Sequence, residues 1–143
     1  MRIVLDTNIV VSALIWGGTP FKLLQIAIDS DFELYTSPAL LTELQEVLSR
    51  EHLATRLLKQ RNSVKSAIRL YRGATIPITP LTVPRAVPND TDDDQVIAAV
   101  LAARADLIVS GDSDLLMLHP WRGIQILNAA DALQFVLDAK TPT

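Results

Sequence analysis

The chain has 143 residues, of which 49% are hydrophobic and 5% aromatic, and its formal net charge is −3. This length allows one ordinary domain with a buried core, and the absence of cysteine excludes a disulfide framework or a thiolate site. Charges interrupt the longest apolar stretch before the roughly 20 residues that span a bilayer, and the N-terminus lacks a secretory-signal pattern. We therefore expect a single cytoplasmic domain over residues 1–143 without membrane contact.

Strand and helix patterns alternate along the chain. In order, the sequence predicts a strand over 2–6, a helix over 20–30, a strand over 32–36, a helix over 38–48, a basic helix over 53–71, a strand over 74–79, a helix over 93–105, a strand over 107–110, a helical turn before 119, a strand over 124–127 and a helix over 129–139. Such alternation predicts an α/β fold with a mainly parallel sheet of four to five strands and right-handed crossovers.

Acidic side chains lie where several of these elements meet one edge of the predicted sheet. Asp6 ends the first strand, and Asp112 and Asp114 directly follow the strand LIVS. Glu43 lies near the start of the helix after the second strand, and Asp94 lies at the start of a helix. Because ligands of such folds gather outside the carboxyl ends of the strands, we expect these acids to converge on one site.

Each acid taken alone also fits a structural role. Asp6 is compatible with an N-cap, Glu43 with the margin of a helix face, and Asp112 with a tight turn. The run of aspartates over 92–94 is different, because one carboxylate is enough for a cap and adjacent carboxylates repel. The cluster therefore favours a bound cation.

The donor types favour a hard cation. Carboxylates without cysteine or a suitably placed histidine select Mg²⁺ or Mn²⁺ rather than zinc, and we interpret His52 and His119 as structural or surface residues. Carboxylate sites for these ions act mostly on phosphates, where two ions lie roughly 3.5 to 4 Å apart. The chemistry indicated is hydrolysis of a phosphodiester bond.

Four sequence features together resemble the PIN-domain ribonucleases, which include the VapC-like toxins of prokaryotic toxin–antitoxin systems. These features are LDTN around Asp6, the glutamate at Glu43, DDDQVIAAVLA and IVSGDSDLL. The resemblance covers essentially the whole chain. It implies a three-layer α/β/α domain and an endoribonuclease that uses one or two Mg²⁺ or Mn²⁺ ions, hydrolyses RNA by metal-activated water, and leaves a 5′-phosphate and a 3′-hydroxyl. It also implies a protein antitoxin and a homodimer or higher homo-oligomer.

The resemblance also assigns roles to individual residues. The catalytic metal ligands would be Asp6, Glu43, Asp94 and Asp112, with Asp114 as an additional ligand. Asn8 and Ser110 would orient water or the ligands. Asp93 would not bind the metal directly but would strengthen the negative field around the ligands, so that Asp93 is expected to be more dispensable than Asp94.

The segment from Arg50 to Arg72 carries seven basic residues against one acidic residue, Glu51. A solvated helix face and a surface for a negatively charged partner are equally compatible with this balance. With an RNA substrate, the side chains expected to hold the phosphate backbone are Arg50, Arg56, Lys59, Arg61 and Lys65.

Other functions remain open from the sequence. The acids also fit an RNA-processing nuclease without an antitoxin, or a regulatory domain that binds metal or RNA without cleaving it. A phosphatase of the haloacid-dehalogenase type is less compatible, because Asn8 stands where that chemistry needs a second aspartate.

Overall fold

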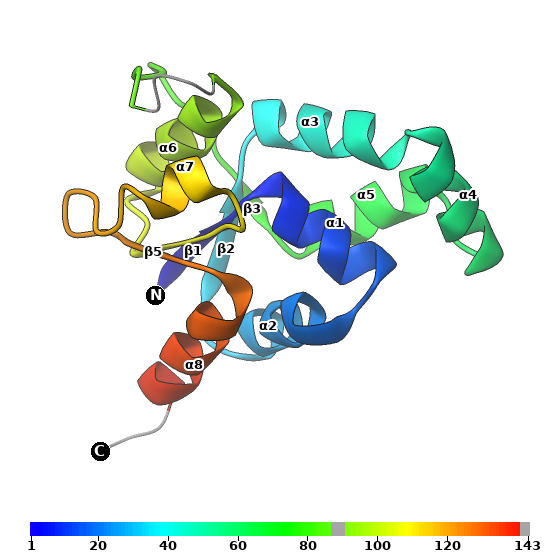
Figure 1. Cartoon of the computed structure of the whole chain (residues 1–143), viewed down its shortest axis with the longest axis horizontal. Coiled ribbons are helices and arrows are strands. Elements are labelled where there is room, and N and C mark those ends of the chain that lie inside the picture. Colours follow the sequence, from blue (N-terminus) through cyan, green and yellow to red (C-terminus); the bar gives the residue numbers. More distant parts are fainter. Residues whose placement is uncertain (87–90, 141–143) are drawn as a thin grey trace.

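The computed structural model describes residues 1–86 and 91–140 and contains one five-stranded sheet (Figure 1). The strands are β1 (Arg2–Leu5), β2 (Glu33–Thr36), β3 (Ile76–Pro77), β4 (Leu107–Val109) and β5 (Gln125–Leu127). All pairings are parallel, and the strand order is β3-β2-β1-β4-β5. The predicted α/β fold with a parallel sheet is confirmed, and each predicted strand is present.

Helices connect the strands. They are α1 (Thr7–Ile15), α2 (Gly18–Asp29), α3 (Pro38–Leu48), α4 (Glu51–Lys59), α5 (Val64–Gly73), α6 (Thr91–Ala103), α7 (Ser113–Leu116) and α8 (Ala129–Lys140). Among the described residues, no single helix is long and apolar enough to cross a membrane, although α1 and α2 pass such a test together as a pair bent by 101°.

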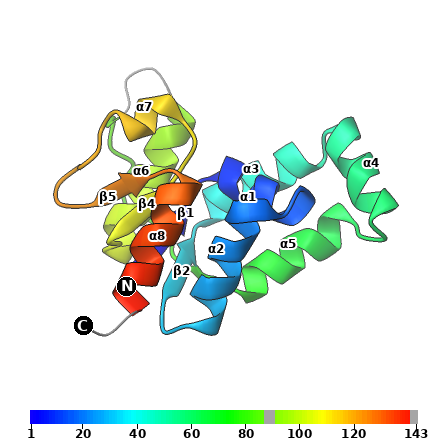
Figure 2. The ribbon, with the colours of Figure 1, turned by 60° about the horizontal axis from the view of Figure 1, so that its bottom comes forward.

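Successive side chains of a strand point to opposite faces of the sheet, and the core accordingly forms two clusters. Ile3 and Leu5 of β1 pack in a cluster with α1, α2 and α8, whereas Val4 packs in a second cluster with α6. This alternation follows from the period of two along a strand. The helices therefore cover both faces of the sheet, and the expected three-layer α/β/α architecture is confirmed (Figure 2).

The N-terminal part of the chain departs from the predicted elements in one place. The segment Thr7–Ile15, for which no helix was predicted, forms α1, and the following helix begins at Gly18 rather than after an N-cap at Thr19. Gly17, the N-cap of α2, and Gly18, its first residue, have φ angles of 76° and 63°. Glycine adopts this left-handed conformation without steric cost, so the pair allows the sharp turn from α1 into α2.

The prediction of a single basic helix over 53–71 is wrong, because the segment forms two helices, α4 and α5. Arg61 has a φ of 59° and ends the first helix, and the Ser63 side chain accepts a hydrogen bond from the backbone N–H of Ser66 at 3.1 Å to begin the second. The two helices project from the body of the sheet at the same end of the molecule (Figures 1 and 2).

Candidate metal centre

The carboxyl ends of β1 and β4 place Asp6 beside Ser110. Asp6 follows the last residue of β1, and its backbone N–H donates to the Val109 carbonyl of β4 at 2.9 Å. The Ser110 Oγ–H donates to Oδ2 of Asp6 at 2.7 Å, and the Thr7 N–H donates to Oδ1 at 2.8 Å. Both Asp6 and Ser110 are buried. Asp6 therefore caps α1, as the structural interpretation expected, and its carboxylate is also held in a fixed orientation at the sheet edge.

The loop after β4 orients a second carboxylate through the same serine. Ser110 Oγ accepts the backbone N–H of Asp112 at 3.0 Å. Oδ1 of Asp112 in turn accepts the N–H of Asp114 at 2.8 Å, which makes Asp112 the N-cap of α7. The SGDSD segment is thus a turn that starts a short helix, and it presents two half-buried carboxylates on the same side.

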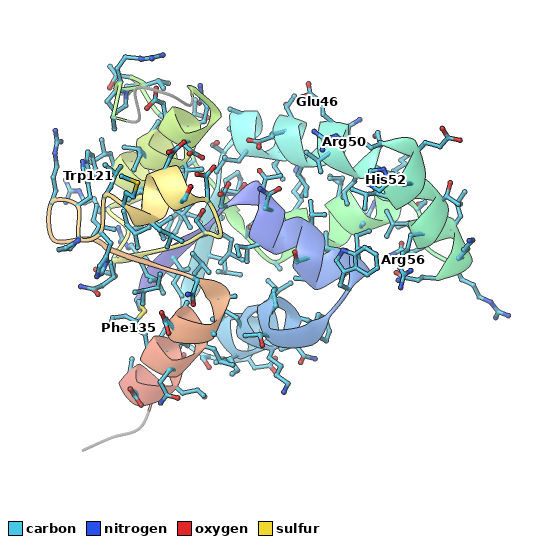
Figure 3. All side chains as sticks on the ribbon, in the orientation of Figure 1. Glu46, Arg50, His52, Arg56, Trp121 and Phe135 are labelled. Carbon is cyan, nitrogen blue, oxygen red and sulfur yellow. The ribbon has the colours of Figure 1, made fainter. Side chains whose placement is uncertain are left out.

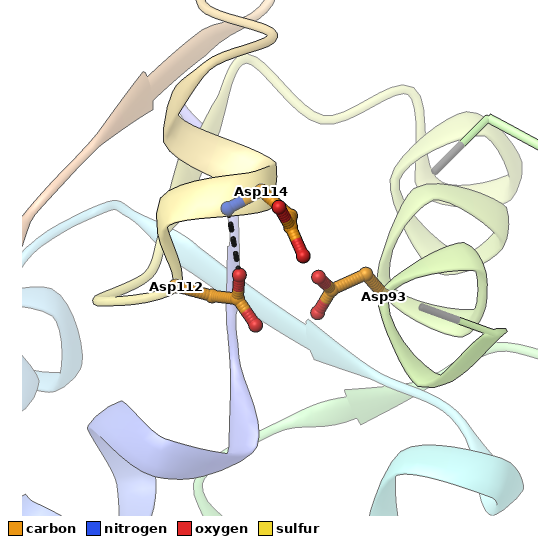
Figure 4. Close-up of side chains that lie close together, drawn as sticks. All are labelled: Asp93, Asp112 and Asp114. Atoms are coloured by element: carbon orange, nitrogen blue, oxygen red, sulfur yellow. Dashed lines mark hydrogen bonds between the residues drawn. The ribbon is translucent and has the colours of Figure 1, made fainter. Parts of the chain in front are cut away.

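Asp93 of α6 completes a group of three carboxylates with Asp112 and Asp114 (Figure 4). One carboxylate oxygen from each residue lies within 4.8 Å of the other two. Asp93 is buried, so its charge is poorly screened by water. Three negative charges at this separation repel each other, and a cation between them removes that repulsion. An all-carboxylate donor set of this kind fits Mg²⁺ or Mn²⁺.

Asp94 has a different set of partners. Its Oδ1 accepts the backbone N–H of Ala86 at 2.9 Å, and its Oδ2 lies 3.6 Å from Nε of Arg85. Successive helix residues point about 100° apart, so Asp94 faces the segment before α6 while Asp93 faces α7. The structure thus brings Asp93, which sequence analysis placed behind the ligands, into the carboxylate group. The prediction that Asp94 is a ligand stays a prediction.

Two further predicted residues lie on the helices around this group. Glu43 is half-buried on α3, a helix that contacts both α1 and α6, and Asn8 is exposed in the first turn of α1. Neither belongs to the group of three carboxylates, and their assigned roles stay predictions. The side chain of Asp92 lies outside the described residues.

The two histidines have surroundings that match their structural interpretation. Nδ1 of His119 accepts the backbone N–H of Ile126 at 2.9 Å and thereby ties the loop after α7 to β5. His52 is exposed on α4. Neither takes part in the group formed by the three aspartates.

The predicted RNA-contacting side chains are exposed on and around α4 and α5. They are Arg50, Arg56, Lys59, Arg61 and Lys65. Figure 3 shows Arg50 and Arg56 on the side of the molecule that carries α4. Sequence analysis missed Trp16, over whose ring the Arg56 guanidinium lies at 4.1 Å from the centroid. The signal available in the sequence was a tryptophan directly before a glycine pair.

Comparison with known proteins agrees with this geometry. Residues 2–114 match the PIN domain family, and the chain belongs to that family. The uncharacterized protein MJ1680 of Methanocaldococcus jannaschii is 30% identical over 120 residues, which cover 83% of this chain and 76% of the relative. The fold is similar to a chain in the crystal structure of VapBC2 from Rickettsia felis bound to a DNA fragment from its promoter. That similarity has a TM-score of 0.64 and 15% identity, and it covers 90% of this chain and 98% of the other.

Proposed function

We propose that this protein is a metal-dependent endoribonuclease that hydrolyses RNA phosphodiester bonds. The observation that carries the proposal is the meeting of Asp93, Asp112 and Asp114 at the carboxyl edge of the sheet. PIN domains are generally nucleases, and this chain's membership of the family supports phosphodiester hydrolysis. The phosphatase of the haloacid-dehalogenase type is not retained, because the chain belongs to a different family.

Asp93, Asp112 and Asp114 would hold one or two Mg²⁺ or Mn²⁺ ions. A bound ion of this kind activates water and neutralises the charge that develops on a phosphate. The repulsion among the three carboxylates gives the site its affinity for a cation, and the Asp114 N–H bond to Asp112 keeps one carboxylate oriented.

Asp6 and Ser110 would complete the acidic edge. Ser110 bonds the Asp6 carboxylate with its hydroxyl hydrogen and the Asp112 backbone with its oxygen, so one side chain fixes two acids relative to each other. This agrees with the orienting role proposed for Ser110. Glu43 and Asn8 remain proposed members, and the contacts of Asp94 favour a role in fixing the segment before α6.

The exposed basic side chains around α4 would bind the RNA backbone. Arg56 and Lys59 lie on α4, which contacts α1, and α1 begins directly after Asp6. Binding through phosphates weakens as salt rises, with a slope set by the number of phosphates contacted. Charge reversal at Lys59, Arg61 and Lys65 together should therefore weaken RNA binding and flatten its salt dependence.

We further propose that the protein acts in the cytoplasm as the toxin of a toxin–antitoxin pair, as a homodimer or higher homo-oligomer. The likeness of its fold to a chain of VapBC2 supports looking for a protein antitoxin. The alternative is a PIN nuclease that processes RNA without an antitoxin. A small DNA-binding protein encoded in the adjacent upstream reading frame, which binds the purified chain and blocks cleavage, would decide for the toxin.

Cleavage of RNA with added Mg²⁺ or Mn²⁺ tests the enzyme. Purified wild type should cut single-stranded RNA only with the ion, and Asp6→Asn and Asp112→Asn should each abolish the cut. The exposed Asp31 provides a control of equal charge change, because Asp31→Asn should cleave like wild type. RNA that is bound but not cut, with the same result in all variants, would instead support a regulatory domain.

A further inference from the structure

Trp16 is an exposed aromatic side chain held by a cation. It is the C-cap of α1 and exposes 59% of its surface. Arg56 of α4 lies over the ring, 4.1 Å from the centroid. Nearby, Nε2 of Gln60 donates to the Ile15 carbonyl at 2.9 Å and fastens the end of α4 to the end of α1. The relative position of Trp16 and Arg56 is therefore fixed by the fold.

The ring of Trp16 is exposed although the core could hold an aromatic side chain of this size at lower free energy. Burying an aromatic side chain is strongly favourable, and a smaller residue would end α1 equally well. The ring keeps 59% of its surface exposed although the Arg56 guanidinium lies over it. The ring and its cation are thus available to a ligand.

We propose that Trp16 and Arg56 form a stacking subsite for a nucleobase of the single-stranded RNA substrate. The inference rests on the proposed ribonuclease function and names a binding site for that substrate away from the carboxylates. Aromatic rings and arginine planes are the groups on which proteins stack unpaired bases, and such stacking tolerates different base identities.

The charge around the pair favours RNA over a protein segment. From Arg50 to Arg61 the chain carries four basic residues and one acidic residue. The neighbours of Arg56 at three or four positions that stay exposed on α4 are His52, Lys59 and Gln60. A polyanion complements this surface, whereas an apolar protein anchor would meet only polar side chains among these exposed neighbours of Arg56.

The distance from the carboxylates suits a single strand. α1 begins directly after Asp6 and has nine residues, which span about 14 Å at 1.5 Å per residue. At roughly 3.4 Å per nucleotide of a stacked strand, this separation is about four nucleotides. A stacked strand whose phosphate lies beside Asp6 therefore needs about four nucleotides to reach Trp16, one more than a stacked trinucleotide supplies.

Two binding measurements test the subsite. In EDTA, where no cleavage occurs, a labelled unstructured RNA decamer should bind Trp16→Ala about 5- to 100-fold more weakly than wild type, and Trp16→Phe should recover most of the affinity. The chain has two tryptophans, so Trp121→Phe leaves Trp16 as the sole tryptophan emitter. Its fluorescence should be quenched by the decamer, and Trp121→Phe itself should bind like wild type.

Cleavage kinetics separate this inference from the proposed function. Trp16→Ala should raise KM for the decamer with kcat unchanged, and should cleave a trinucleotide like wild type. If wild type cleaves RNA but Trp16→Ala binds and cleaves the decamer equally well, the subsite is wrong and the ribonuclease stands. If wild type neither binds nor cleaves RNA with Mg²⁺ or Mn²⁺, both fail. Loss of a protein partner by Trp16→Ala with unchanged RNA affinity would assign the ring to that partner and overturn the inference.

Discussion

The adjacent residues Asp93 and Asp94 should respond oppositely to the same substitution. Asp93 faces Asp112 and Asp114, with carboxylate oxygens within 4.8 Å, whereas Asp94 accepts a hydrogen bond from the Ala86 N–H at 2.9 Å. Replacing either aspartate by asparagine removes one negative charge and keeps the shape of the side chain. The pair is therefore a matched test of which carboxylate binds the cation.

The expected magnitudes follow from these contacts. Without metal, Asp93→Asn removes two like-charge repulsions, each roughly 3 kcal/mol at an effective dielectric constant of about 20. Because Asp112 and Asp114 are half-exposed, screening reduces the total gain in the free energy of unfolding to about 1–2 kcal/mol. Asp94→Asn instead turns a charge-assisted bond to the Ala86 N–H into a neutral one and should lose about 1 kcal/mol.

Thermal unfolding with and without Mg²⁺ or Mn²⁺ measures both effects. An ion that binds only the folded state stabilises wild type by about 2.7 kcal/mol at 100 times its Kd. Asp94→Asn should retain this metal-dependent rise in Tm, and Asp93→Asn should lose it along with RNA cleavage. If Asp93→Asn keeps the rise and Asp94→Asn loses it, Asp94 is the ligand, as sequence analysis predicted, and the assignment of Asp93 is wrong.

Three other predictions test the site and the core. Ser110→Ala removes the donor to buried Asp6 and should cost about 1.5–3 kcal/mol in urea unfolding and lower metal affinity about 10- to 100-fold; unchanged metal affinity would refute its orienting role. Leu57→Ala, at a fully buried site on α4, should cost about 2–5 kcal/mol. Its control Leu58→Ala, at a position 68% exposed, should change stability by less than about 0.5 kcal/mol. Burial raises the pKa of Tyr71 above its ordinary value of 10.0, so the folded state favours the protonated hydroxyl. The contribution of Tyr71 to the free energy of unfolding is therefore complete below pH 10 and is lost as pH rises through the pKa of the folded state. The stability of Tyr71→Phe should fall less steeply than that of wild type from pH 9.5 to 11.5, and equal slopes would contradict the assignment.

The sequence predicted the sheet well but missed α1, for a reason visible in its side chains. Its sequence TNIVVSALI places Ile9, Val10 and Val11 in succession, and all three are buried. β-branched residues are weak helix formers, and a run that is apolar on several sides shows no period of 3.6. Packing against the sheet, α2 and α3 decides its conformation, and that packing is a tertiary effect.

The same limitation affected the choice between Asp93 and Asp94. The helix that they begin continues as VIAAVLAA, in which the six residues from Val96 to Leu101 are apolar and five of them are buried. A helix that is apolar all round has no polar face from which its phase can be read. The sequence therefore placed Asp6 and Asp112 at the carboxyl ends of their strands, where the structure has them, but it did not show which neighbour faces α7. A shift of one residue turns a side chain by about 100°.

The contributions of Asp93 and Asp94 to the stability of the fold have opposite signs. Without a cation, Asp93 repels Asp112 and Asp114, and that repulsion pushes the first turn of α6 away from α7. Asp94, in the same turn, accepts a bond from the Ala86 N–H, and at about 1.5–3 kcal/mol for a bond to a charged group this bond offsets a repulsion of similar size. The Asp94 bond therefore compensates for the repulsion at Asp93 in the free energy of unfolding. A double variant with both aspartates replaced should consequently be no less stable without metal than Asp94→Asn alone, because the repulsion between Asp93 and its two neighbours is then gone.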